Sequence, residues 1–153
     1  MYKVAELRKK SEPILDYLEN SKDKTTKFME RVHSYVLDQE TADKIREHAG
    51  DAVVVVFSAE WCPDCHRNVP VLGLIHEATG LEVMVFGHLM RDSKSNTRKW
   101  AVPPSPPEVE EFNVTKIPYI LVLSLKGEKI GEIIENPPQG KTLEQAILEA
   151  VEA

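Results

Sequence analysis

The sequence predicts an α/β fold in which a central mixed sheet of about four strands is flanked by helices. Three observations lead to this prediction. An apolar run at 53–57 is followed by a helical pattern and by a second strand-like run at 81–86. Two further strand patterns, at 119–125 and 128–135, are joined by a turn with a glycine. A helical pattern follows them, and the first fifty residues also read as helical.

The composition is that of a globular protein. The chain has 153 residues, of which 42% are hydrophobic and 29% charged, and its formal net charge is −6. This acidic balance argues against nucleic acid or an anionic membrane as a partner. No apolar run approaches the roughly 20 residues of a spanning helix, and the first ten residues lack the apolar stretch of a secretory signal. We therefore expect a cytoplasmic protein without nucleic-acid or membrane partners.

Residues 1–50 are expected to form a helical N-terminal extension packed on the core of a domain at 51–153. The helical patterns cover about 4–18 with a restart near Pro13, then 26–36 after a cap at Thr25 or Thr26, and 41–48 before Gly50. In the second of these helices we place apolar positions at Phe28, Val32, Tyr35 and Val36. Such helices most often cover an exposed face or edge of a sheet.

The segment Val53–Phe57 is too apolar for a half-exposed strand and fits a central strand covered on both faces. A helix is expected from about Cys62 to Thr79, ended by Gly80, before the strand Leu81–Phe86. The proline-rich residues 87–107 predict an irregular loop that leads to a short helix at 108–112. The last helix begins with a capping box formed by Thr142 and Gln145.

Both cysteines of the chain lie in the segment Trp61-Cys62-Pro63-Asp64-Cys65, directly after the central strand. This spacing places two thiols one helical turn apart at a strand-to-helix junction. Backbone N–H groups at the start of a helix favour an anion, so the first sulfur should ionise easily. We expect Cys62 to attack a disulfide and Cys65 to resolve the mixed disulfide. The redox group is then the Cys62–Cys65 disulfide itself, with no cofactor and no metal.

Further positions extend the pattern beyond the cysteine pair, and with them the chain resembles the thioredoxin superfamily over about 52–153. They are Ala59-Glu60-Trp61 before the nucleophile, Pro70 within the active-site helix, Ile117-Pro118 as the isoleucine and cis-proline that face the dithiol, and Gly127 in the hairpin. The resemblance implies a thioredoxin-like fold and dithiol–disulfide exchange. It also implies a substrate surface formed by Trp61, Pro63, Asp64, Ile117 and Pro118.

Two residues near the dithiol are expected to tune its pKa. His66 follows Cys62 by four residues, so one helical turn could bring its ring toward the sulfur, although a solvent-facing ring is the alternative. Glu60 is one possible substitute for a buried carboxylate that thioredoxins carry where this chain has Val56; Asp64 or water are the others. The negative charge of Asp64 should oppose ionisation of Cys62. The histidines at 33, 48, 76 and 88 have no partner spacing that indicates a site.

The chain departs from the thioredoxin pattern at two further places. A glycine usually lines the substrate surface near the end of the last strand, where this chain has Glu135 or Asn136. The usual first strand is replaced by the helical N-terminal region.

These features predict a protein-disulfide reductase of thioredoxin type. Its partners would be disulfide-containing proteins and an external reductase or thiol as electron donor, since the chain carries no dinucleotide fingerprint. A glutaredoxin-like, glutathione-linked protein is an alternative because Pro63 follows the first cysteine. A metal-binding or redox-inert interaction module is another.

Overall fold

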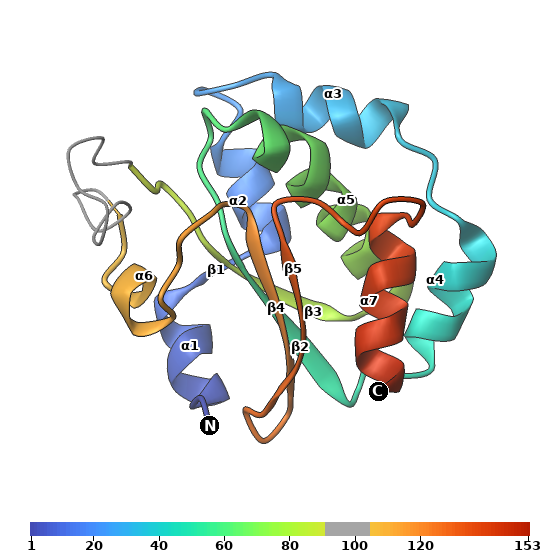
Figure 1. Cartoon of the computed structure of the whole chain (residues 1–153). Coiled ribbons are helices and arrows are strands. Elements are labelled where there is room, and N and C mark those ends of the chain that lie inside the picture. The colour runs from blue at the N-terminus through green and yellow to red at the C-terminus, as the bar shows by residue number, and fades with distance from the viewer. Residues whose placement is uncertain (91–104) are drawn as a thin grey trace.

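A computed structural model describes residues 1–90 and 105–153 of the chain (Figure 1). Its helices are α1 (Val4–Lys10), α2 (Ile14–Asn20), α3 (Lys27–Ser34), α4 (Gln39–Arg46), α5 (Pro63–Thr79), α6 (Glu108–Glu111) and α7 (Leu143–Glu152). Its strands are β1 (Glu12–Pro13), β2 (Ala52–Phe57), β3 (Glu82–Phe86), β4 (Tyr119–Ser124) and β5 (Lys129–Ile134).

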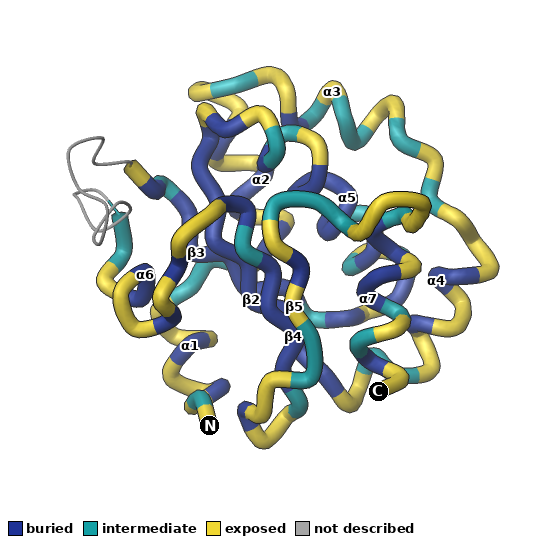
Figure 2. The backbone as a smooth tube through the Cα atoms, viewed as in Figure 1, coloured by how far each residue is buried: buried dark blue, intermediate teal, exposed yellow. Residues whose placement is uncertain are grey.

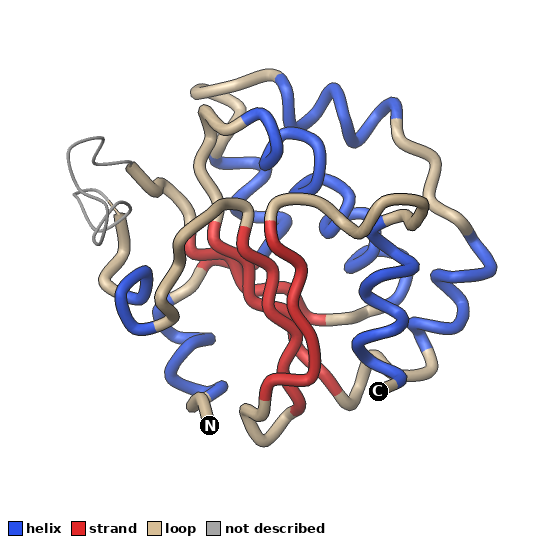
Figure 3. The backbone as a smooth tube through the Cα atoms, in the orientation of Figure 1, coloured by secondary structure: helices blue, strands red, loops and turns tan. Residues whose placement is uncertain are grey.

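The strands form one mixed sheet in the order β1-β3-β2-β4-β5 (Figure 3). The central strand β2 pairs in parallel with β3 and antiparallel with β4, and β4 pairs antiparallel with β5. All six residues of β2 are buried, as expected for a strand covered on both faces. The predicted fold class is confirmed, with four longer strands and one short edge strand.

Helices cover both faces of the sheet. α5 and α7 pack on one face, with α3 against α5 and α4 against both α5 and α7, while α1 and α6 lie on the other side (Figure 1). On that second side the ring of Phe57 contacts Phe112, which stacks on Tyr2 at a centroid distance of 4.3 Å. The buried part of the chain follows the sheet and the helix faces turned toward it (Figure 2).

The N-terminal helices share one hydrophobic core with the sheet. Ile14, Tyr17, Phe28 and Ile45 are each at most 1% exposed and belong to the same buried cluster as β2 and β3. α2 packs so closely on α5 that a Cβ at Gly73 would lie 2.7 Å from Leu18 Cδ1. Residues 1–50 therefore contribute to the interior around which the whole chain folds.

Two features of the N-terminal region differ from the sequence prediction. Glu12 and Pro13 form β1, an edge strand antiparallel to β3, where no strand was expected. Two residues are too few to show an alternating pattern, and an edge position tolerates a proline without an N–H group. α3 ends at Ser34, so Tyr35 and Val36 lie beyond it; Tyr35 has extended backbone, and Val36 is 88% exposed.

The remaining elements agree with the sequence prediction to within a few residues. Gly80 ends α5 with a left-handed φ of 80°, and both hydrogen bonds of the capping box between Thr142 and Gln145 are formed. Of the predicted irregular loop at 87–107, residues 91–104 lie outside the described residues. Within the described residues no helix is both long and apolar enough to cross a membrane.

The core position of α2 can be tested with two neighbouring residues. Ile14 is 1% exposed and Leu15 is 40% exposed. Ile14→Ala should lower the free energy of unfolding by about 2–5 kcal/mol, because it leaves a cavity in the shared core. Leu15→Ala, the control, should change it by no more than about 0.5 kcal/mol. Urea denaturation should show one transition for each variant; a separate early transition in Ile14→Ala would show that the N-terminal region folds independently.

Candidate dithiol active site

The two cysteines lie at the junction between β2 and α5. Cys62 is the N-cap residue of α5, with φ −85° and ψ 121°, and Pro63 occupies the first helical position. A proline is well tolerated there because the first N–H groups of a helix have no partner within the helix. Both thiols are free, and the Cys65 side chain lies on the first turn of the helix.

The Cys62 thiol has a pKa lowered to about 7. Its hydrogen bond with the Cys65 thiol favours the thiolate most, and the backbone N–H groups of Cys65 and Asp64 favour it further. Burial and the charge of Asp64 act in the opposite direction. The Cys62 thiol is therefore ionisable near neutral pH, although the residue is only 6% exposed.

Cys65 has the opposite character. Its side chain is fully buried, and burial raises the pKa of its thiol well above the ordinary value. The hydrogen bond and the negative charge of Cys62 raise it further, whereas hydrogen bonds with the Ala59 backbone and the Ser58 side chain lower it. The two thiols therefore differ strongly in pKa, although they lie only one helical turn apart.

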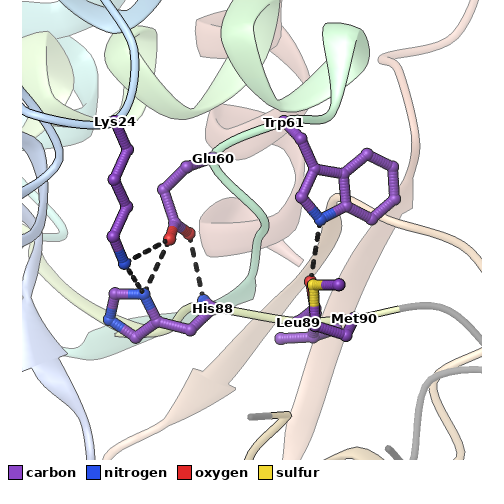
Figure 4. Close-up of a pocket in the computed structure, with 6 residues that line it drawn as sticks. All are labelled: Lys24, Glu60, Trp61, His88, Leu89 and Met90. Carbon is purple, nitrogen blue, oxygen red and sulfur yellow. Dashed lines mark hydrogen bonds and ion pairs between the residues drawn. The ribbon is translucent and has the colours of Figure 1, made fainter. Parts of the chain in front are cut away.

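The residues predicted to form a substrate surface surround Cys62 but differ in exposure. Trp61 is 48% exposed, and its indole Nε1 donates to the Leu89 carbonyl at 3.0 Å (Figure 4). Pro63 is exposed. Ile117 and Pro118 are buried, their peptide bond is cis, and the Cys62 Sγ lies 3.9 Å from the Ile117 carbonyl oxygen. Neither of the last two residues exposes a side chain to a partner, and the Pro118 carbonyl already accepts from the Glu135 N–H at 2.9 Å.

Glu60, expected to tune the thiols, has its carboxylate in a polar cluster with Lys24 and His88 (Figure 4). Lys24 Nζ donates to Oε1 at 3.1 Å, the His88 ring Nδ1 lies 2.7 Å from the same oxygen, and the His88 backbone N–H donates to Oε2 at 3.1 Å. Burial acts to raise the pKa of Glu60, but hydrogen bonds from His88, Tyr17 and Lys24 outweigh it, so the pKa is lowered. Glu60 is therefore a carboxylate at neutral pH.

His88, whose spacing in the sequence indicated no site, lies beside Glu60 in the structure. Glu60 and His88 are 28 residues apart, but each follows the carboxyl end of one of two neighbouring parallel strands, β2 and β3. With Lys24, Trp61, Leu89 and Met90 they line a cavity of about 280 Å³. The sequence could have indicated this cluster, because both residues follow the carboxyl ends of strands expected to be neighbours.

Tyr17 and Ser58 also lie at the site, although nothing in the sequence indicated them. The Tyr17 hydroxyl donates to Glu60 Oε2 at 2.8 Å and lies 2.9 Å from Ser58 Oγ. Both residues are fully buried, and Gly87 leaves room for the Tyr17 ring, which a Cβ at that position would meet. The ring also packs against Phe28, at a centroid distance of 5.6 Å.

His66, the second residue expected to tune the thiols, is half-buried. Its Nε2 lies 2.6 Å from the Glu60 carbonyl oxygen, and its ring meets Phe28 edge-on. The ring thus contacts the backbone that leads into the dithiol and stays partly exposed to solvent.

The structure also places the residues at which this chain departs from thioredoxins. Val56 is fully buried in β2 and supplies no carboxylate. Glu135, one of the two residues expected at the glycine position, has a φ of 67°, a left-handed conformation that glycine adopts most easily. The Asn68 side chain of α5 donates to its carbonyl at 2.9 Å and so holds β5 to the active-site helix.

No group of three or more His, Cys, Asp or Glu in the parts of the chain that the structure describes is placed to hold a metal ion.

A thioredoxin family model matches residues 11–148, which include the dithiol and most of the N-terminal helices. The chain belongs to the thioredoxin family. The curated proteins contain no significant match to this thioredoxin-family chain.

Two solved structures are similar to this thioredoxin-family protein in fold. One is a protein of unknown function from Pseudomonas aeruginosa, with 17% identity, a TM-score of 0.61, and coverage of 99% of this chain and 90% of the other. The second is an HIV epitope-scaffold protein, with 17% identity and a TM-score of 0.61, covering 99% of this chain and 94% of the other. At this identity the similarity shows the fold alone.

The pKa of Cys62 gives a direct test of the site. The rate of alkylation by a small thiol reagent should rise with pH around a midpoint near 7, because the thiolate is the reacting form. Asp64→Asn should move this midpoint to lower pH, because the carboxylate that opposes ionisation is removed. Asp43→Asn, a control at an exposed ion pair on α4, should leave the midpoint unchanged. A midpoint that stays in place in Asp64→Asn would contradict this account.

Proposed function

We propose that this protein is a thiol–disulfide oxidoreductase that reduces protein disulfides through Cys62 and Cys65. One observation carries the proposal: two free thiols share the first turn of α5, and one has a lowered pKa and the other a raised pKa. A nucleophile has to be a thiolate at working pH, whereas a resolving thiol has to stay protonated until the nucleophile is consumed.

The reaction that fits these thiols has two steps. The Cys62 thiolate attacks one sulfur of a substrate disulfide, forming a mixed disulfide and releasing the first substrate sulfur as a thiolate. Cys65 then loses its proton and attacks the Cys62 sulfur, which breaks the bond to the second substrate sulfur. The substrate gains two electrons, and the protein is left with a Cys62–Cys65 disulfide.

The surroundings of Cys62 favour an extended segment as substrate. Trp61 and Pro63 are exposed on either side of the nucleophile, and the backbone of Ile117 lies beside it, with its carbonyl oxygen 3.9 Å from the Cys62 sulfur. Extended peptides commonly bind through backbone hydrogen bonds of this kind. Asp64 places a negative charge at the rim and favours substrates without acidic groups next to the disulfide.

The oxidised protein has to be returned to the dithiol by a donor outside this chain. We propose an external reductase protein or a small thiol, in the cytoplasm, where thiols are kept reduced. The glutaredoxin-like alternative requires binding of glutathione, and the metal-binding alternative requires a metal held by the dithiol. Direct binding measurements can therefore distinguish them.

The roles of the two cysteines can be tested by trapping. Cys65→Ser should accumulate a mixed disulfide with a protein substrate, because the resolving thiol is absent. Cys62→Ser should form none and should lose disulfide reductase activity, measured with dithiothreitol as donor, by at least about 100-fold. Equal trapping by both variants, or full activity of Cys62→Ser, would rule out the assignment.

The alternatives predict binding that the reductase proposal does not. Elemental analysis of freshly purified protein should show metal well below one equivalent per chain, and calorimetry should show no saturable binding of glutathione. One equivalent of zinc or iron that is lost in Cys62→Ser would favour the metal-binding alternative. Saturable glutathione binding would favour the glutaredoxin-like one.

A further inference from the structure

Resolution of the mixed disulfide requires a proton to leave a buried thiol. Cys65 is fully buried, and in the resting dithiol its hydrogen bond is to the Cys62 thiolate. Once Cys62 is bound to a substrate sulfur, it carries no charge to hold that hydrogen. Val56, on the strand beside the dithiol, has no group that accepts a proton. The side chain of Ser58 is a hydrogen-bond partner of Cys65, and this contact favours the Cys65 thiolate.

A buried chain of hydrogen bonds leads from Ser58 to the edge of the protein. Tyr17 Oη lies 2.9 Å from Ser58 Oγ and 2.8 Å from Glu60 Oε2. Glu60 lines the cavity of about 280 Å³ described above, together with Lys24 and His88, so the chain ends where water can enter. Ser58, Tyr17 and Glu60 are each at most 9% exposed.

The number of available hydrogens fixes the direction of this chain. Glu60 is ionised and can only accept, so the single hydroxyl hydrogen of Tyr17 goes to it. Ser58 must then be the donor in its bond with Tyr17, which leaves the Ser58 oxygen to accept from Cys65. All the hydrogens therefore point from Cys65 toward Glu60.

We propose that Ser58, Tyr17 and Glu60 form a proton relay that deprotonates Cys65 during resolution, an inference that rests on the proposed reductase function. The Cys65 proton moves to Ser58, the Ser58 hydroxyl proton moves to Tyr17, and the Tyr17 proton moves to Glu60. Afterwards Ser58 donates to the new Cys65 thiolate. Cys65 attacks the Cys62 sulfur, the substrate sulfur leaves as a thiolate, and Glu60 returns its proton to water in the cavity.

Ser58 contacts the reacting sulfur, whereas Tyr17 and Glu60 act through it as positioning residues. Tyr17 comes from α2, outside the strand and helix that carry the dithiol. The relay thus assigns the N-terminal helices a part in the chemistry.

The relay can be tested with an aromatic disulfide that releases one coloured thiolate on attack by Cys62 and a second on resolution by Cys65. In single-turnover stopped-flow measurements, Tyr17→Phe keeps the ring but removes the hydroxyl. It should slow the second release by about 100-fold or more at neutral pH, because general base catalysis typically contributes about 10²–10⁴-fold. The first release should stay within about twofold, because the surroundings of Cys62 are unchanged. The pH profile of the second release should move to higher pH.

Ser58→Ala should reproduce this pattern from the other end of the relay. Tyr35→Phe is the matched control: it removes a tyrosine hydroxyl that also donates to a glutamate, Glu144, but lies outside the relay, and both releases should match those of the wild type.

Three results would overturn the relay. A second release with wild-type rate and pH profile in both Tyr17→Phe and Ser58→Ala would show that the hydroxyls carry no proton. Equal slowing of both releases would show a structural role. A wild-type protein that forms no mixed disulfide with the reagent would overturn the reductase function itself, and the relay with it.

Discussion

The pKa values of the two thiols depend on the first turn of α5, whose N–H groups have no partner within the helix. A helix has more donors than acceptors at its N-terminus, and here the side chain at the N-cap is a sulfur rather than an oxygen. The Cys65 thiol stabilises the Cys62 thiolate most, and the N–H groups of Cys65 and Asp64 stabilise it further. Because β2 is buried on both faces, the same turn places Cys65 in the interior, where a thiolate is unfavourable. One junction thus gives two identical side chains opposite tendencies to ionise.

The N-terminal helices are part of this arrangement as well as of the core. α2 contributes Ile14 to the shared interior and Tyr17 to the hydrogen bonds beside the dithiol. Lys24, in the segment between α2 and α3, forms an ion pair with the Glu60 carboxylate. A buried carboxylate needs several hydrogen bonds to remain charged, and these come from three separate parts of the chain. Packing of α2 therefore determines both the stability and the electrostatics of the site.

Local patterns in the sequence were sufficient for most of the fold and for the two thiols. The apolar β2, the cysteine spacing and the Thr142 capping box each depend on neighbours within a few residues. Contacts between distant segments were not visible: Tyr17 and Ser58 are 41 residues apart, and no periodicity relates them. The end of α3 was misplaced because Tyr35 leaves the helix to donate its hydroxyl to Glu144, a contact made only in the folded chain. The position of His88 was partly predictable, because adjacent parallel strands bring the residues that follow their carboxyl ends close together.

If the protein reduces disulfides as we propose, the low exposure of Cys62 has a consequence for selectivity. With 6% of the residue exposed, a sulfur–sulfur bond recessed in a compact partner cannot approach along the line that displacement requires. Disulfides in protruding loops, frayed termini or partly unfolded chains can. Limited access to this sulfur would then sort partners of the proposed reductase by how far their crosslinks stand out, whatever their redox potentials.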